Sequence, residues 1–356
     1  MRICYFGAFD PQYARNNFLR QSLTIAGCQI VSCNVPTVWP TYRKYPALLQ
    51  QYRRLCRECD LIIVAEFGQT IVPLAWLLGR LRSQVVVFDH VIGLYESSVI
   101  EKRRFAPKSF AARKLYLLDS YAGKLPAGIL TGTSAYKDYL GAEFSLSLDR
   151  IHVAPLGVND EIFFRQANLK INSDAINILF LGSYLPNHGV DIILEAAALL
   201  QSEGNLHFRL VGDGLGKQAA HELSRELKLT NIEFIPKVKF LDVPAQIAAA
   251  DIVLGNFGDT PQSRKAMANK VLQGLAMQRA VISGDTLAIR ENFNHGEHLW
   301  LCPLGDPKAL AGGLLKLAQD AQLRKKIATA GYSRVTKRLT PQAVGPALKD
   351  YLSSLL

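Results

Sequence analysis

The chain has little of what marks several common protein classes. Its six cysteines are few for 356 residues and lie mostly inside apolar segments, a pattern typical of reduced thiols and not of a disulfide scaffold. No apolar run reaches the ~18 residues that a membrane-spanning helix needs. The sequence contains neither the glycine-rich fingerprint GxGxxG nor a Walker A motif. These absences argue against a disulfide-rich domain, an integral membrane protein and the commonest nucleotide-binding loops.

One cysteine pair, Cys56 and Cys59, has the CxxC spacing of a redox or zinc half-site. The pair lies at the end of a predicted helix, before a predicted strand at residues 60–66. Because no second CxxC accompanies it, the sequence favours two structural thiols over a metal site.

Acidic residues are scarce in the first part of the chain. The net charge is +11, and residues 1–157 hold 19 Lys and Arg against 11 Asp and Glu. Such an excess can face nucleic acid, anionic lipid or a diphosphate-bearing substrate, or it can be a solvated surface. No helix-turn-helix, RNA-recognition or zinc-finger pattern supports nucleic acid. The excess includes Arg53, Arg54, Arg57, Lys102, Arg103, Arg104, Lys108, Arg113 and Lys114.

Short apolar runs alternate with helical patterns along the chain. Runs of this kind, bounded by turn signals, are typical of parallel strands covered on both faces. The first run, in MRICYFGAF, lacks the apolar core of a signal peptide and predicts a strand, so we expect a cytoplasmic protein. The alternation predicts an α/β fold of two facing Rossmann-like domains, with ligands in a central cleft at the carboxyl ends of the strands.

A polar, loop-like stretch interrupts the alternation and divides the chain. The predicted parts are an N-terminal domain at residues 1–157, a linker at 158–174, a C-terminal domain at 175–340 and a final helix at 341–356 that packs back on the first domain.

A glycine-containing loop follows the first predicted strand. Gly7 lets the backbone turn tightly and approach a ligand closely, and a helix begins soon after it. The free N–H groups of a helix N-terminus attract anions. The candidates to face a ligand here are Asp10, Tyr13, Arg15 and Asn16.

A similar loop opens the second domain. Gly182 ends a predicted strand, Ser183 follows it, and His188 stands just before the next predicted helix. An imidazole beside a helix N-terminus suits a diphosphate oxygen, and the alternative is a surface histidine in an ordinary loop. The next predicted strand ends at Gly212, and we interpret the adjacent Asp213 as part of a simple turn.

The segment ANKVLQGLAM carries the most informative residues. Asn269 is a favoured residue type for a helix N-cap, which would place Lys270 in the first helical turn. The helix dipole disfavours a cation at that position. Lys270 makes physical sense if an anion lies between it and the helix, and the alternative is a surface lysine.

Four segments in order, VGDG, AADIVLG, NKVLQGLAM and AVISGDT, resemble glycosyltransferase family 4 and its relatives with the GT-B fold. In the N-terminal half, YFGAFDPQYARNN, FDHVIGLYES and APLGVNDEIF are similar to one branch of that family. The resemblance covers nearly the whole chain. It implies an acceptor domain followed by a donor domain, and transfer of a sugar with retention from a nucleotide-diphosphate sugar, without an obligatory metal or other cofactor.

The resemblance implies a donor site in which two carboxylates are replaced. Lys265 and Gln273 align with the family's Glu-x7-Glu motif. Gln273 can still hydrogen-bond a sugar hydroxyl, whereas Lys265 cannot accept a hydrogen bond. The nucleotide base is expected to meet the backbone of Pro236, Lys237 and Val238.

The implied phosphate contacts are also changed. The main-chain N–H groups of Asn269 and Lys270 match those that hold the diphosphate, and Gly182 and Gly212 belong to the same donor site. Ser183 and His188 align with the family's phosphate-binding Arg and Lys. We hypothesise that Lys270 and His188 together neutralise the leaving diphosphate.

For the acceptor domain, the resemblance matches the family's cleft histidine to the corner at Asp89 and His90, either of which can face the sugar. Gly7 matches the loop glycine that lets this domain approach the diphosphate. Glu96 and Asp119 are candidates to shape the acceptor site or to form local salt bridges.

The favoured interpretation is a retaining glycosyltransferase of the hexosyltransferase type, which acts on a glycan, glycolipid or polysaccharide precursor. Its basic domain would contact the anionic inner face of a membrane peripherally. The replaced carboxylates leave open a catalytically silent subunit that binds nucleotide sugars. A sugar-nucleotide epimerase of the same fold is a further alternative.

Overall fold

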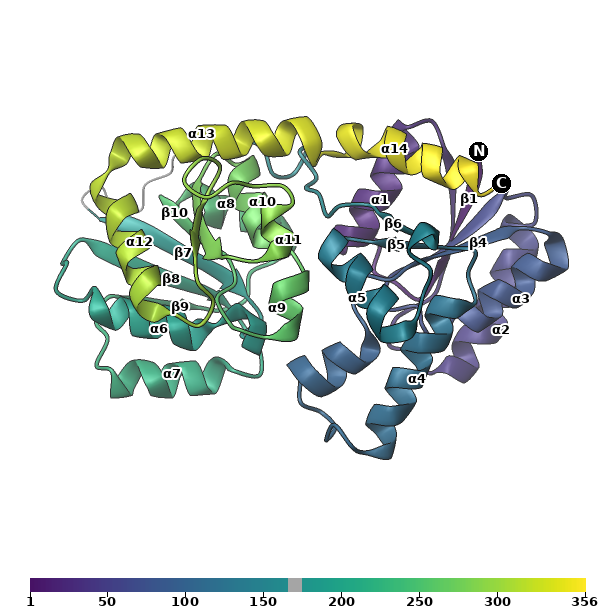
Figure 1. Cartoon of the computed structure of the whole chain (residues 1–356), viewed down its shortest axis with the longest axis horizontal. Coiled ribbons are helices and arrows are strands. Elements are labelled where there is room, and N and C mark those ends of the chain that lie inside the picture. Colours follow the sequence, from purple (N-terminus) through teal and green to yellow (C-terminus); the bar gives the residue numbers. More distant parts are fainter. Residues whose placement is uncertain (166–174) are drawn as a thin grey trace. The chain divides into compact units, whose positions relative to one another are not determined.

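Two parallel sheets organise the chain, one in each of two units (Figure 1). The computed structural model describes residues 1–165 and 175–356. Unit 1 comprises Met1–Asn159 and Leu339–Leu356, and unit 2 comprises Asp160–Arg338. Most of the predicted linker, residues 166–174, lies outside the described residues. The two six-stranded α/β sheets with their flanking helices confirm the predicted fold class.

The sheet of unit 1 has the strand order β2-β1-β3-β4-β5-β6. The chain runs from β1 to β2 on one side and then crosses to β3 on the other, so it reverses direction between β1 and β3. The strands are β1 (Arg2–Gly7), β2 (Gln29–Asn34), β3 (Leu61–Val64), β4 (Val85–Asp89), β5 (Gly128–Thr131) and β6 (Ile151–Val153). The helices are α1 (Ala14–Ile25), α2 (Thr41–Leu55), α3 (Val72–Arg82), a π-helical turn (Glu96–Glu101), α4 (Phe110–Lys124), α5 (Ser134–Phe144), a 3-10 turn (Leu148–Arg150) and α14 (Pro341–Ser354).

Strand β1 shows why the apolar runs are nearly continuous. Successive side chains of a strand point to opposite faces. Ile3 and Tyr5 pack in the core on one face, and Cys4 and Phe6 pack in the core on the other. All four are fully buried, so neither face of the strand tolerates a polar position.

The final helix, α14, lies along α1 within unit 1 (Figure 1). Leu348 and Leu352 enter the same core as Leu19 and Leu23. The Nζ of Lys349 also donates a hydrogen bond of 2.9 Å to a carbonyl at the end of α1. Burial of these leucines provides the free energy that holds the chain terminus on unit 1.

The sheet of unit 2 has the order β12-β11-β10-β7-β8-β9, and the chain reverses direction between β7 and β10. The strands are β7 (Ile176–Gly182), β8 (Leu206–Gly212), β9 (Ile232–Ile235), β10 (Ile252–Leu254), β11 (Ala280–Gly284) and β12 (Trp300–Cys302). The helices are a 3-10 turn (Pro186–His188), α6 (Val190–Leu199), α7 (Lys217–Glu226), a 3-10 turn (Phe240–Asp242), α8 (Val243–Ala248), α9 (Pro261–Lys265), α10 (Asn269–Ala276), α11 (Leu287–Arg290), α12 (Pro307–Gln319) and α13 (Ala321–Arg338).

All six cysteines are free and buried, and Cys56 and Cys59 lie in the core of unit 1. Within the described ranges, no group of three or more His, Cys, Asp or Glu side chains can hold a metal ion. No helix in the same ranges is both long and apolar enough to cross a membrane.

Gly212 holds the ends of β7 and β8 together. It pairs in register with Gly182 and has a φ of +149°, a conformation that L side chains rarely adopt. A Cβ at this position would lie 1.8 Å from the carbonyl oxygen of Gly182. Any side chain would therefore push the two strand ends apart.

Gly212→Ala is expected to lower the free energy of unfolding of unit 2 by on the order of 3 kcal/mol, because strained backbone and a steric clash both oppose the change. Urea unfolding followed by circular dichroism measures the effect. Gly204→Ala is the matched control, since a Cβ there meets nothing within 4 Å. The control should change the free energy by less than about 0.5 kcal/mol. Equal effects of the two changes would contradict this account of Gly212.

Candidate functional site

The carboxyl edge of the unit 2 sheet gathers predicted site residues from three neighbouring strands. Gly182 ends β7, Gly212 ends β8, and the segment 236–238 directly follows β9. Because β7 and β10 flank the point where the strand order reverses, the loops after them leave the sheet in opposite directions, and ligands of such sheets bind beside this point. Pro236 and Lys237 are exposed there, and Val238 is half-buried.

Lys270 is a buried cation in the first turn of α10. Its side chain is 7% exposed, and its Nζ forms no hydrogen bond with any described residue. The Nζ lies 4.2 Å from the centre of the Phe180 ring, whose electron-rich face attracts it. Burial lowers the pKa of Lys270 well below its usual 10.5. The ammonium group is therefore costly to keep charged until an anion reaches it.

His188 lies next to the same aromatic ring. Its ring centre is 5.8 Å from that of Phe180, in an edge-on arrangement. A Cβ on Gly182 would come within 2.7 Å of the His188 Nδ1, so glycine is needed for the imidazole to fold back over the strand end. That Nδ1 is buried without a hydrogen-bond partner in the described part of the chain. Burial, and then the charge of Lys270, lower the pKa of His188 well below 6.5.

The structure therefore brings the two hypothesised phosphate ligands together but alters their charge. His188 is neutral at pH 7 while the site is empty, because its pKa is lowered. Two adjacent cations repel each other in a buried site unless an anion lies between them. The pair is consequently suited to a group that carries negative charge.

The prediction that Asn269 caps α10 is wrong. Ala268 occupies the N-cap position, and no side chain accepts from the first N–H groups of the helix. Asn269 is instead the first helical residue. The Val271 N–H donates to the Ala268 carbonyl at 3.1 Å, and because alanine has no side-chain acceptor, the N–H groups of Asn269 and Lys270 remain for a ligand.

The other predicted donor residues surround α10 and the loop after β7. Lys265 is the last residue of α9 and is half-buried. Gln273 is half-buried one turn into α10, and Ser183 is exposed directly after β7. Asn256, which sequence reasoning missed, follows β10, and its buried Oδ1 has no partner among the described residues. In the sequence, only the position of Asn256 after a predicted strand indicated that it could be a site residue.

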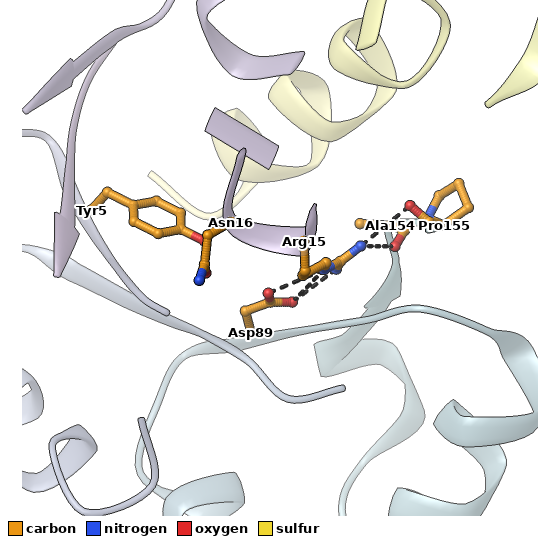
Figure 2. Close-up of polar contacts among 6 residues, drawn as sticks. All are labelled: Tyr5, Arg15, Asn16, Asp89, Ala154 and Pro155. Atoms are coloured by element: carbon orange, nitrogen blue, oxygen red, sulfur yellow. Dashed lines mark hydrogen bonds and ion pairs between the residues drawn. The ribbon is translucent and has the colours of Figure 1, made fainter. Parts of the chain in front are cut away.

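In unit 1, a buried ion pair joins Arg15 of α1 to Asp89 at the end of β4 (Figure 2). The Nη2 of Arg15 donates to Asp89 at 2.8 Å, and its Nε lies 3.1 and 3.2 Å from the two carboxylate oxygens. The Nη1 donates to the carbonyls of Ala154 at 2.8 Å and Pro155 at 3.2 Å. The guanidinium group is 3% exposed at most, and the carboxylate is fully buried.

These contacts correct two predictions for the acceptor. Arg15 does not face a ligand, because Asp89 and two carbonyls engage its guanidinium group. Asn16 is also turned inward, since its Oδ1 accepts from the Tyr5 hydroxyl at 3.0 Å (Figure 2). Of the same group, Tyr13 is 43% exposed, and Asp10 is exposed with its Oδ1 accepting a backbone N–H.

The corner after β4 does not present a side chain to solvent. His90 is 1% exposed and packs against the rings of Phe88, Tyr136 and Phe144. Burial lowers the pKa of His90 to about 4, so the imidazole is neutral. Both ring nitrogens lack hydrogen-bond partners in the described residues. Asp89 and His90, the two alternatives for the residue that faces the sugar, are thus both enclosed by unit 1.

Three further residues complete the carboxyl edge of unit 1. Gly7 ends β1 with a φ of +149°. Glu96, a predicted acceptor residue, is 4% exposed in the π-helical turn. Glu66, which the sequence analysis missed, is 6% exposed just after β3, beside the point where the strand order reverses. Burial, with the charge of Asp89 adding to it, raises the pKa of Glu66 to about 8.

The comparisons with known proteins agree with this architecture. Residues 175–320 match the family model described as glycosyl transferases group 1. The capsular polysaccharide biosynthesis glycosyltransferase CapM of Staphylococcus aureus is 22% identical over 80% of this chain and 75% of its own length. An uncharacterized glycosyltransferase of Methanocaldococcus jannaschii is 23% identical over 49% of this chain, and the match spans only 46% of that relative.

A solved structure settles the fold of the whole chain. The Anabaena protein HepE in complex with UDP superposes with a TM-score of 0.76 at 15% identity, covering 99% of this chain and all of that one. The whole chain therefore has the two-domain GT-B fold, and within it residues 175–320 match the group 1 glycosyl transferase model. The assignment of the chain to glycosyltransferase family 4 stays a prediction.

The buried ion pair yields a stability prediction for unit 1. Arg15→Met should lower the free energy of unfolding of unit 1 by about 3–5 kcal/mol, because it leaves the Asp89 carboxylate buried without a partner. The double variant Arg15→Met with Asp89→Asn should recover part of this loss, since the uncompensated charge is gone. Thermal and urea unfolding of the purified protein measure both variants.

Arg290→Met is the control, since it removes an equally close but exposed ion pair to Asp285. It should change the free energy by about 1 kcal/mol or less. If Arg15→Met were as mild as this control, the ion pair would not hold unit 1 together as described.

Proposed function

We propose that the protein transfers a sugar from a nucleotide-diphosphate sugar to an acceptor hydroxyl, with retention at the anomeric carbon. The observation that carries the proposal is Lys270, a buried ammonium group without an anionic partner at the start of α10. A diphosphate supplies the missing negative charge. The free N–H groups of the helix and the His188 ring add further donors for the same group.

The electrostatics of this site suit departure of the diphosphate. The leaving group gains negative charge as the bond to the sugar breaks, while the sugar becomes positive. Fixed donors that point at developing charge lower the barrier without having to reorganise. Lys270 and the α10 N-terminus are held by the fold before the donor arrives, which is the arrangement that such preorganisation needs.

Retention is proposed without an enzyme nucleophile. In this proposal the acceptor hydroxyl attacks on the face that the diphosphate leaves. Asp89 is a poor candidate for a nucleophile, because Arg15 engages both of its oxygens. No obligatory metal is proposed, since cationic and N–H groups of the protein itself can face the diphosphate.

For the acceptor we propose a glycan or lipid-linked precursor of a polysaccharide. Two relatives support this class: CapM, named for capsular polysaccharide biosynthesis, and a protein of Erwinia amylovora named for amylovoran biosynthesis, which is 26% identical over 48% of this chain. We also propose a cytoplasmic protein whose basic unit 1 contacts the anionic face of a membrane. The excess of Lys and Arg in residues 1–157 motivates this part of the proposal.

One observation favours a second candidate. Lys265 and Gln273 stand where the family resemblance places two carboxylates, and Lys265 cannot accept hydrogen bonds from a sugar. A silent subunit that binds a nucleotide sugar without transferring it would share every other feature of the site.

A panel of UDP-, GDP- and dTDP-sugars, titrated calorimetrically and then assayed for hydrolysis and transfer to acceptor extracts, tests the proposal. We expect one nucleotide class to bind and its sugar to be transferred with an unchanged anomeric configuration, read by NMR. Binding with no turnover under any condition would support the silent subunit. Conversion of the donor to an epimer would also contradict the proposal.

Lys270→Met should have opposite effects on stability and on affinity. The empty protein should be equally or more stable, because an uncompensated buried charge is removed. Affinity for the nucleoside diphosphate should fall by about 10- to 100-fold, the value of hydrogen bonds to charged groups. Binding to the native protein should take up protons near neutral pH, because the anion raises the lowered pKa of His188.

Calorimetry in buffers of different ionisation enthalpy measures this uptake, which Lys270→Met should reduce. Lys308→Met, on the exposed surface of α12, is the control and should leave both affinity and proton uptake unchanged. Unchanged affinity in Lys270→Met would show that the lysine does not contact the diphosphate.

A further inference from the structure

Helix α4 of unit 1 carries a set of exposed side chains that do not pack in the core of the unit. Six of its fifteen residues are exposed, and in this fully described helix none of the six is acidic. Three are apolar or aromatic, and three are basic. We call this set the α4 face: Phe110, Arg113, Lys114, Leu117, Tyr121 and Lys124.

The α4 face is one continuous stripe. Its residues recur at intervals of three and four, which places them within roughly 100° around the helix axis. Phe110 is 85% exposed, Leu117 52% and Tyr121 62%. Large apolar side chains gathered on one exposed stripe mark an interaction surface, whereas single ones are ordinary.

The opposite face already holds the helix in place. Ala112, Ala122 and Gly123 are buried against the rest of unit 1. The carboxylate of Asp119 accepts backbone N–H groups of Leu94 at 2.8 Å and Tyr95 at 2.9 Å. Because these contacts fix α4, the exposed apolar side chains are not needed for its packing.

The segment before the helix continues the same pattern. Arg103, Arg104 and Lys108 are exposed, and Phe105 is 42% exposed. No described carboxylate forms an ion pair with Arg113, Lys114 or Lys124. The surface therefore offers unneutralised positive charge interleaved with apolar groups.

The combination of positive charge and exposed apolar side chains indicates the class of partner that the α4 face can bind. Positive charge alone suits any polyanion, but most contacts to nucleic acid are polar ones to phosphates and sugars, which a helical stripe of large apolar side chains does not provide. A bilayer containing acidic lipids offers both phosphate head groups and, a few ångströms deeper, acyl chains. The alternation of basic and apolar groups on one helix face matches that layering.

We propose that the α4 face docks on an anionic lipid bilayer, with Arg113, Lys114 and Lys124 at the head groups and Phe110 and Leu117 at the acyl boundary. The inference rests on the membrane contact proposed above and assigns that contact to one helix. It separates α4 from α2, whose Arg53 and Arg54 are also exposed but are expected to have no part in it.

Co-sedimentation with vesicles of phosphatidylcholine and phosphatidylglycerol in equal parts, against phosphatidylcholine alone, tests the proposal. The native protein should bind the anionic vesicles about tenfold more tightly or better, and added salt should weaken that binding. Arg113→Glu with Lys114→Glu should lose about tenfold or more. Phe110→Ser with Leu117→Ser should lose a similar factor at unchanged charge.

Arg53→Glu with Arg54→Glu on α2 makes the same charge change as the α4 pair and should bind like the native protein. All four substituted α4 positions are exposed, and thermal unfolding confirms that each variant folds. Should a double variant not fold, Lys114→Gln and Leu117→Gln as single changes serve in its place.

Equal binding to both vesicle types by the native protein would overturn the membrane contact itself. Preserved binding in both α4 variants, or an equal loss in the α2 control, would overturn the assignment to α4. A loss with the charge variant alone, accompanied by tight binding to RNA, would replace the bilayer by a polyanion. Donor titration of the same variants should be unchanged, so failure here is distinct from failure of the proposed transferase.

Discussion

The buried ammonium group of Lys270 is the feature on which the proposed chemistry of unit 2 depends. Burying a charge without a partner costs several kcal/mol, and the Phe180 ring returns only about 0.5–2 kcal/mol of that. Nothing in the packing of α10 requires a cation at this position, since a methionine would fill similar space. An anion that binds at Lys270 would remove this cost, which is why the donor site is proposed there. The parallel sheet supplies the place, because it directs the loops after β7 and β10 to one edge.

Unit 1 has a comparable edge in which the charge is already satisfied. Arg15 and Asp89 neutralise each other, and two carbonyls take the remaining donors of the guanidinium group. The charges at the carboxyl edge of the unit 1 sheet are therefore paired within the protein, whereas Lys270 at the edge of the unit 2 sheet has no anionic partner among the described residues. At the same edge, Glu66 has a pKa of about 8, so its carboxyl group is mostly protonated at neutral pH. A neutral carboxyl group can donate a hydrogen bond as well as accept one, which suits contact with a hydroxyl.

The sequence predicted features that are local and missed those that depend on distant residues. Strand positions followed from short apolar runs, and Lys270 was singled out because a cation at a helix start conflicts with the dipole. The prediction that Arg15 faces a ligand was wrong, and the choice between Asp89 and His90 stayed open, for a different reason. Arg15 finds its partner 74 positions away, and rings from α5 enclose His90. The predicted N-cap of α10 was wrong by one residue. Ala268 occupies the N-cap position, although the side chain of Asn269 is the better hydrogen-bond acceptor.

The proximity of Lys270 and His188 also bears on which anion the site selects. The charge of Lys270 lowers the pKa of His188, so a single negative charge suffices for the lysine and leaves the imidazole neutral. A diphosphate carries negative charge on two linked phosphates, and the second charge makes protonation of His188 favourable as well. In the proposed site, a diphosphate should therefore bind with a more favourable free energy than a monophosphate. In a reaction whose leaving group is a nucleoside diphosphate, the same coupling strengthens as the bond to the sugar breaks, because the charge on the departing oxygen increases.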